Sequence, residues 1–233
     1  MKILLKNNKE EIGKEIASRI VELINKKPNT VLGLATGSSP ITTYKELIKA
    51  YKEKKVSFKY VTTFNLDEYV GYKREKDSYK YFMHHNLFDE IDIKDVNTHF
   101  PDATNPLAYD KEIELKEIDF QVLGIGADGH IGFNEPMTSF DSKTHITKLT
   151  KQTISDNSQY FESIDAVPKE AVTMGLSTIM KAKEIVLIAT GKNKRSAIKA
   201  LLAGESKECP ASILNRHPNV TIYLDKDADP REN

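Results

Sequence analysis

The sequence has 233 residues, of which 39% are hydrophobic and 29% are charged, and these proportions are ordinary for a soluble globular protein. Its 34 basic and 34 acidic side chains balance, so we expect no nucleic-acid partner and no attraction to a membrane surface. The single cysteine, Cys209, excludes an intrachain disulfide and a multi-cysteine metal site, and we interpret it as a structural thiol.

The N-terminal part of the chain predicts strands and helices in alternation. Residues 3–5 form an apolar run that suits a strand but is too short for a signal peptide or a membrane span, so we expect a cytoplasmic protein. Asn8 and Glu11 predict a capping box for a helix whose apolar side chains recur at helical spacing over 12–24. Residues 31–35 are continuously apolar, as expected for a strand of a parallel sheet.

Small polar residues follow that strand. We predict Ser39 as the N-cap and Pro40 as the first residue of the next helix. Backbone N–H groups, hydroxyls and the positive end of a helix dipole would converge on Thr36, Gly37, Ser38 and Ser39, which favours an anion site. An ordinary strand-to-helix loop accounts for the same residues equally well.

The rest of the chain continues the alternation. A strand over 61–66 leads directly into two acids, Asp67 and Glu68. Segment 150–166 is polar, and we predict that it is a mobile lid. The other predicted elements are helices over 78–88 and 107–115, strands over 120–123, 145–149, 184–190 and 220–224, and a helix that ends at Leu202.

Alternating strands and helices predict an α/β fold, namely a Rossmann-like, doubly wound, mostly parallel sheet flanked by helices on both faces. The sequence contains no internal repeat and no convincing linker, so we expect residues 1–233 to form one domain. Loops that follow parallel strands open on one edge of the sheet, where such sheets bind their ligands. The polar loops 36–39, 67–68, 124–135 and 191–194 should therefore face one site.

The glycine-rich loop before Pro136 supports two hypotheses. Gly124, Gly126 and Gly129 match the spacing of the dinucleotide-binding fingerprint. That fingerprint requires a helix directly after the glycines and an acidic residue about 20 positions later. Pro136 disfavours a helix here, and residues 149–150 contain no acid, so we disfavour a nucleotide site.

The second hypothesis is acid–base chemistry. His130 lies between Asp128 and Glu135, and either acid could hold its ring in one tautomer while it transfers protons near neutral pH. Asp67, at the end of another strand, could serve as a separate base. One histidine with carboxylates is a poor zinc site, so we expect no metal.

Three segments resemble the glucosamine-6-phosphate deaminase family: residues 33–40, 65–71 and 124–136. Residues 167–169 and 171–175 also fit, and the resemblance covers essentially the whole chain. Its most specific part is Asn-Glu-Pro at 134–136. The related 6-phosphogluconolactonases share the fold and the start of this loop, but they continue with a Ser-Leu-Phe-Pro-like sequence.

The resemblance implies an enzyme of amino sugar metabolism that converts glucosamine 6-phosphate and water to fructose 6-phosphate and ammonia. It implies that His130 opens the sugar ring, with Asp128 and Glu135 positioning it, and that Asp67 takes the proton from C2. These steps are proton transfers, so neither a metal nor an organic cofactor is required. The residues implied to hold the substrate phosphate are Thr36, Gly37, Ser38, Ser39 and Lys194.

Two departures from the family pattern matter. Gln159 stands where the family usually has an arginine that helps to bind phosphate, and this loss is expected to weaken binding by about 1–2 kcal/mol. His145 and Thr147 stand where large allosteric hexamers carry basic residues, so we expect a monomer or a small homo-oligomer. Two alternatives stay open, a 6-phosphogluconolactonase-like hydrolase and a non-catalytic sugar-phosphate sensor.

Overall fold

A seven-stranded parallel sheet forms the centre of the computed structural model, which describes residues 1–231. The strands lie in the order β1-β10-β9-β6-β2-β3-β5, and every pair of neighbours is parallel. This order confirms the predicted mostly parallel sheet. The strands are β1 (Lys2–Leu5), β2 (Val31–Leu34), β3 (Thr62–Asn65), β5 (Thr98–His99), β6 (Phe120–Gly124), β9 (Ile185–Ala189) and β10 (Val220–Leu224).

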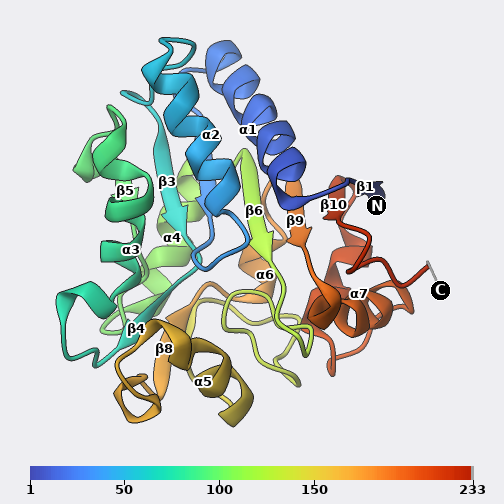
Figure 1. The fold of residues 1–233 in the computed structure, drawn as a ribbon. Coiled ribbons are helices and arrows are strands. Elements are labelled where there is room, and N and C mark those ends of the chain that lie inside the picture. Colours follow the sequence, from blue (N-terminus) through green and yellow to red (C-terminus); the bar gives the residue numbers. More distant parts are fainter. Residues whose placement is uncertain (232–233) are drawn as a thin grey trace.

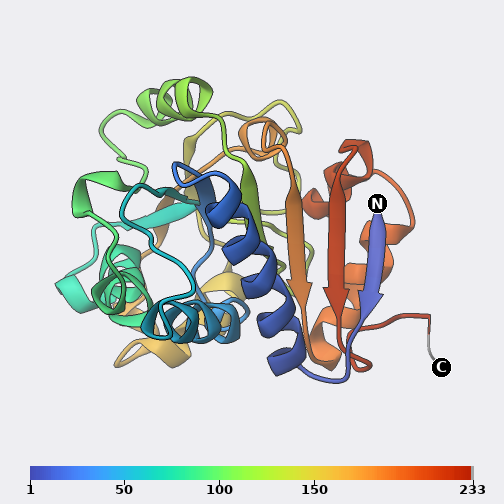
Figure 2. The same cartoon turned by 90° about the horizontal axis from the view of Figure 1, so that it is seen from above.

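Helices cover both faces of this sheet (Figures 1 and 2). Alternate residues of β9 show why: Ile185 and Leu187 pack into one buried apolar cluster, and Val186 and Ile188 pack into the other. A strand buried on both faces needs apolar side chains at every position, which explains its continuous apolar run. One cluster contains α1 (Lys9–Lys26), α2 (Ile41–Lys52) and α3 (Tyr79–Asn86), and the other contains α4 (Pro106–Lys116), α6 (Leu176–Ile179) and α7 (Arg195–Leu202).

A second, three-stranded sheet was not predicted. It consists of β4 (Asp67–Val70), β8 (Glu170–Thr173) and β7 (His145–Lys148), and its neighbours are antiparallel. Leu66 alone separates β3 from β4, so the chain passes from one sheet to the other across a single residue. The predicted edge strand near 145–149 is confirmed, because β7 pairs only with β8 within the described residues.

The helix starts were predicted with mixed success. Asn8 caps α1, because its Oδ1 accepts a hydrogen bond of 2.9 Å from the Glu11 amide. The Glu11 carboxylate reaches the amide of Asn7 instead of that of Asn8, so the reciprocal half of the box is shifted by one residue. The prediction for Ser39 was wrong. Pro40 is the N-cap of α2 and already has nearly helical backbone angles, so the chain turns into the helix without a side-chain cap.

Candidate active site

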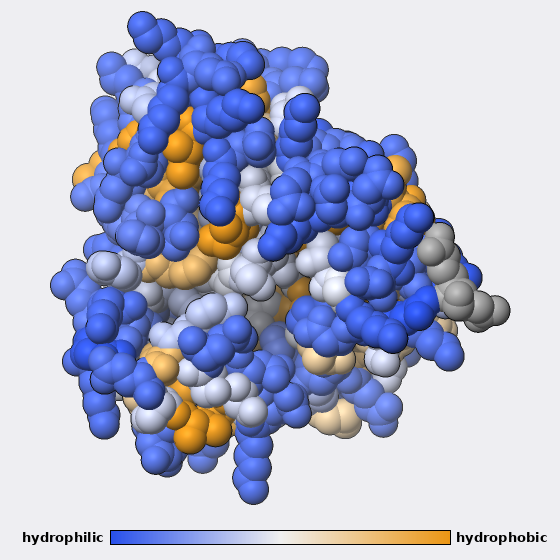
Figure 3. All heavy atoms as spheres, viewed as in Figure 1, coloured by the Kyte–Doolittle hydropathy of each residue, from blue (hydrophilic) through white to orange (hydrophobic). Residues whose placement is uncertain are grey.

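The four predicted loops do meet at one edge of the large sheet. A cavity of about 350 Å³ opens beyond the carboxyl ends of the strands, where the space-filling view shows a hollowed face (Figure 3). Its lining includes residues 36–39 with Asp67, His130 and Lys194. Glu68 is the exception among the predicted polar residues. Its carboxylate turns away to accept hydrogen bonds from the amides of Tyr79 and Lys80 at the start of α3.

His130 and Asp128 form a closely bonded pair of side chains in the site. Nδ1 of His130 lies 2.7 Å from Oδ1 of Asp128, and the His130 amide donates to the same oxygen over 3.2 Å. Burial raises the pKa of Asp128, but the hydrogen bonds and positive charge of His130 outweigh burial and leave that pKa below its ordinary value. An ionised Asp128 holds the proton on Nδ1, so Nε2 is the nitrogen available to a substrate.

Glu135 also lies near the same ring nitrogen. Its Oε2 is 3.7 Å from Nδ1 of His130, and this oxygen is buried without a hydrogen-bond partner among the described residues. Its Oε1 accepts from the Thr150 amide at 3.1 Å and from the Thr153 hydroxyl at 2.7 Å. The three predicted residues of the loop, Asp128, His130 and Glu135, are therefore brought together.

Glycines allow this arrangement. A Cβ at Gly126 would lie 2.2 Å from Cε1 of His130, so the ring needs the glycine backbone beneath it. Gly129 has a φ of +89° and is covered by the buried thiol of Cys209, which supports the structural interpretation of that cysteine. No helix begins directly after Gly129 in the described chain, and residues 131–134 close a tight bridge instead. The dinucleotide fingerprint thus lacks the helix that it requires.

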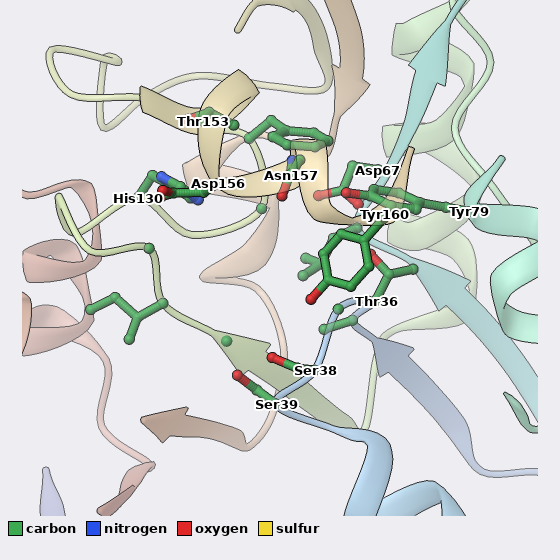
Figure 4. Close-up of a pocket in the computed structure, with 18 of the residues that line it drawn as sticks. Thr36, Ser38, Ser39, Asp67, Tyr79, His130, Thr153, Asp156, Asn157 and Tyr160 are labelled. Carbon is green, nitrogen blue, oxygen red and sulfur yellow. The ribbon is translucent and has the colours of Figure 1, made fainter. Parts of the chain in front are cut away.

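Asp67 faces the same cavity from the start of β4, across from His130 (Figure 4). No hydrogen-bond donor of residues 1–231 reaches its carboxylate. The residue as a whole is only 5% exposed. Burial, with a smaller contribution from the charge of Glu68, raises the pKa of Asp67 to about 8. A carboxyl group with such a pKa can accept and return a proton near neutral pH.

The predicted phosphate residues line another part of the cavity. Ser38 and Ser39 lie on the loop between β2 and α2, on the far side of the cavity from the helix that carries Thr153 (Figure 4). Gly37 has a φ of +82°, which makes this turn possible. Lys194 lies at the start of α7, where burial lowers its pKa and the charges of Asp156 and Asp128 partly oppose that shift. Hydroxyls, amides and one lysine suit an anion.

One group of side chains has the spacing of a metal site. The ligand atoms of Asp128, His130 and Glu135 all lie within 4.8 Å of one another. One imidazole with two carboxylates is a poorer zinc set than the two or three histidines of many catalytic zinc sites. We therefore keep acid–base chemistry as the interpretation of this cluster.

Segment 150–166 contributes residues that the sequence analysis did not single out. Helix α5 (Lys151–Asn157) and the turn that follows it supply Thr153, Asp156, Asn157 and Tyr160 to the lining of the cavity (Figure 4). The side-chain amide of Asn157 donates a hydrogen bond of 2.9 Å to the Tyr69 hydroxyl. Gln159 also lines the cavity, and its side-chain amide bonds to the Asp156 carbonyl. The pattern Thr150-x-x-Thr153, typical of a capped helix start, was the available signal.

Comparison with known proteins gives consistent results. Residues 6–223 match the family described as glucosamine-6-phosphate isomerases/6-phosphogluconolactonase. A glucosamine-6-phosphate deaminase of Mycoplasma mycoides subsp. mycoides SC is 53% identical over 98% of this chain and 96% of its own. One from Thermoanaerobacter pseudethanolicus is 49% identical, with 98% of this chain and 94% of its own covered.

Solved structures separate into two levels of similarity. A monomeric glucosamine-6-phosphate deaminase superposes with a TM-score of 0.95 at 41% identity, with 98% of each chain covered. A 6-phosphogluconolactonase from Thermotoga maritima superposes with a TM-score of 0.75 at 21% identity, covering 96% of this chain and 98% of its own, which shows a shared fold alone. The chain belongs to the family of glucosamine-6-phosphate isomerases and 6-phosphogluconolactonases.

Proposed function

We propose that this protein is a glucosamine-6-phosphate deaminase, an enzyme that converts glucosamine 6-phosphate and water to fructose 6-phosphate and ammonia. The observation that carries the proposal is the position of Glu135, 3.7 Å from His130, in a chain about half identical to proteins named as such deaminases. Two kinds of proton-transfer group facing one cavity suit this reaction, which first opens a sugar ring and then moves a proton between carbons.

In the proposed ring-opening step, His130 acts through Nε2. It takes the proton of the C1 hydroxyl as the bond between C1 and the ring oxygen breaks, and the ring oxygen receives a proton in return. The imidazolium that forms is stabilised by Asp128 and Glu135, which both lie near Nδ1. Two carboxylates near one imidazole are a direct way to favour its charged form.

In the proposed isomerisation step, Asp67 removes the proton from C2 and a proton is delivered to C1, while the amino group loses a proton and the C1 oxygen gains one. This leaves a carbon–nitrogen double bond at C2, which water hydrolyses to the ketone with release of ammonia. Asp67 must be ionised to act, although its pKa is about 8 in the protein without substrate. The positively charged amino group at C2 of the substrate would favour the charged form of Asp67, so substrate binding would prepare the base.

The phosphate supplies binding energy away from the reacting atoms. We assign it to the turn from Thr36 to Ser39 and to Lys194, which share the cavity with Asp67 and His130. Anchoring one end of a flexible open-chain sugar fixes C1 and C2 relative to Asp67 and His130. The segment 150–166, which borders the same cavity, would act as a lid over the bound sugar.

The proposal extends to the biological setting. We place the enzyme in the cytoplasm, in the breakdown of N-acetylglucosamine, as a hydrolase acting on a carbon–nitrogen bond. No helix of residues 1–231 has the length and apolar composition to span a bilayer. We propose a monomer, because the solved deaminase with 41% identity is described as monomeric.

An assay with two substrates tests the proposed function. Purified protein is incubated with glucosamine 6-phosphate, and ammonia and fructose 6-phosphate are measured against a heat-inactivated control. We expect both products in equal amounts. Ammonia at the level of the control would contradict the proposal. Hydrolysis of 6-phosphogluconolactone without deamination would instead assign the protein to the lactonases that share its fold.

A further inference from the structure

Thr153 lies outside the acid–base residues of the proposed reaction, yet it contacts one of them directly. We infer that Thr153 is a positioning residue, which holds Glu135 against His130 and makes that hold depend on the docking of the lid helix α5. The expected effect of Thr153 on kcat rests on the proposed function. The structural link between Thr153 and Glu135 can be tested separately.

The two oxygens of Glu135 have different surroundings. Oε1 receives both hydrogen bonds, from the Thr153 hydroxyl at 2.7 Å and the Thr150 amide at 3.1 Å. Oε2 receives none from the described residues and lies 3.7 Å from Nδ1 of His130. A carboxylate is planar, so fixing one oxygen with two donors also fixes the direction of the other. The bonds to Oε1 therefore determine where the free oxygen faces the histidine.

Burial strengthens the hydrogen bonds to Glu135 and keeps water from replacing them. Thr153 is 2% exposed and Glu135 is 6% exposed, so water has little access to replace a lost donor. A hydrogen bond to a charged group is worth more than one between neutral groups, and an unsatisfied buried charge is costly. Without Thr153, Glu135 would keep a single donor on Oε1 and could rotate away from the histidine.

Both donors belong to the lid rather than to the loop that carries His130. Thr150 caps helix α5, since its side chain accepts from the Thr153 amide, and Thr153 lies in the first turn of that helix. At its other end, α5 is attached by the bond from Asn157 to the Tyr69 hydroxyl. Movement of the start of α5 away from the cavity would remove both donors from Glu135 at once. Ring-opening geometry would thus be complete only with the start of the lid in place.

Kinetics of two substitutions test the positioning role. Thr153→Val keeps the shape of the side chain and removes its hydroxyl, whereas Thr153→Ser keeps the hydroxyl. We expect Thr153→Val to lower kcat by about 10- to 100-fold, the loss expected for one hydrogen bond to a charged group. KM should stay within about twofold, because the phosphate residues are untouched. Thr153→Ser should restore most of kcat.

Thr178 supplies a matched control. Its buried hydroxyl also donates to a buried carboxylate, that of Asp110, but neither residue lines the cavity. Thr178→Val should lower stability while kcat stays within about twofold of the unaltered protein. The inference is overturned if Thr153→Val also keeps kcat within twofold, if its loss falls on KM alone, or if Thr178→Val loses as much kcat.

Hydrogen exchange tests the link between the lid and Glu135 without any substrate. Thr153→Val and Glu135→Leu should each speed exchange in α5, and Thr178→Val should not. The double variant should exchange no faster than the faster single variant, because both substitutions remove the same bond. Additive acceleration would overturn the link. If the unaltered protein releases no ammonia, the proposed function fails, and this measurement still decides whether Thr153 and Glu135 act together.

Discussion

Two aspartates of the site have opposite properties: Asp67 lines the cavity, and Asp128 is bonded to His130, which lines it. Asp128 is bonded twice to His130, and its pKa lies below the ordinary value although burial opposes this. Asp67 is buried without a hydrogen-bond donor from residues 1–231, and its pKa rises to about 8. The same side chain is thus kept ionised in one place and able to hold a proton in the other.

The difference follows from what each neighbourhood supplies. On the Asp128 side, a glycine turn brings an imidazole and an amide to the carboxylate. On the Asp67 side, a strand start between two sheets brings the carboxylate near the aromatic side chains of Tyr69, Tyr79 and Tyr109 and supplies no hydrogen-bond donor from residues 1–231. Asp128, which stays ionised, can stabilise a protonated histidine. Asp67, whose pKa lies near neutral pH, can accept and return a proton. Four predictions test this difference between the two aspartates.

Removing the poised acid should have the largest effect. Asp67→Asn cannot accept a proton, so we expect kcat for ammonia release to fall by about 10³-fold or more. Binding of fructose 6-phosphate should persist, because the phosphate residues lie elsewhere in the cavity. Steady-state assays and the shift in thermal midpoint on adding the sugar measure the two quantities. Ligand binding with turnover abolished would also exclude the non-catalytic sensor. Retention of more than a tenth of kcat would refute the role of Asp67.

Removing the charged acid should have a smaller and kinetically distinct effect. Asp128→Asn keeps the size of the side chain but loses the charge that supports an imidazolium, so kcat should fall by about 100-fold. Substrate deuterated at C2 distinguishes the two acids. If ring opening has become limiting, the isotope effect on kcat should shrink toward unity in Asp128→Asn. An isotope effect that grows instead would place Asp128 in the C2 proton transfer.

The contrast between these acids was only partly readable from sequence. The motif around His130 was predicted and its three residues do converge. The environment of Asp67 was not predicted. Residues 61–69 look like one strand and a loop in the sequence, whereas the chain passes from one sheet to another at Leu66. Glu68 was placed with Asp67 for the same reason. Strand alternation sends its side chain to the other face, where it caps α3.

Local patterns succeeded where neighbours in sequence decide the structure, and failed where distant segments do. Continuous apolar runs identified the long buried strands, since burial on both faces requires them. The two-residue strand β5 lies in a polar segment and pairs with β3 through tertiary placement alone. The contact of Thr153 with Glu135 spans 18 positions in the sequence, and no spacing rule connects helix α5 to the turn that carries Glu135.

The pH dependence of stability should differ in sign between the two acids. The folded-state pKa of Asp67 is raised from 3.8 to about 8, so the folded protein retains a proton that the unfolded chain has lost between these values. Wild-type stability relative to Asp67→Asn therefore falls as pH rises from about 4 to 8 and is constant outside that window. We expect the change to be about 2 kcal/mol, less than the full shift, because water enters around a buried charge.

Asp128→Asn is the matched measurement. The pKa of Asp128 is lowered, so its contribution to stability is present above the unfolded pKa and is lost as pH falls through the folded one. Relative to this variant, the wild type should lose stability toward acid, the reverse of the trend for Asp67→Asn. Urea unfolding from about pH 2 to 9 measures both, because the change for Asp128 lies below its ordinary pKa of 3.8. Parallel trends for the two variants would remove the contrast between the acids.

Gln159→Arg should have the smallest effect, and it asks whether phosphate binding is separate from both acids. Gln159 is exposed at the edge of the cavity, where its amide only bonds to the Asp156 carbonyl. An arginine there adds a positive charge near a dianionic ligand, and an exposed charge of this kind is worth about 0.2–1 kcal/mol. We expect KM to fall by up to about fivefold, or to stay unchanged, with kcat within twofold. The gain should diminish in high salt, because a charge at the cavity edge is screened.

A clear rise in KM for Gln159→Arg would mean that segment 150–166 binds phosphate through contacts that the arginine disrupts. A large change in kcat would mean that charge on the lid reaches Asp67 or His130, so that the two acids and the phosphate cannot be treated as separate parts of the site.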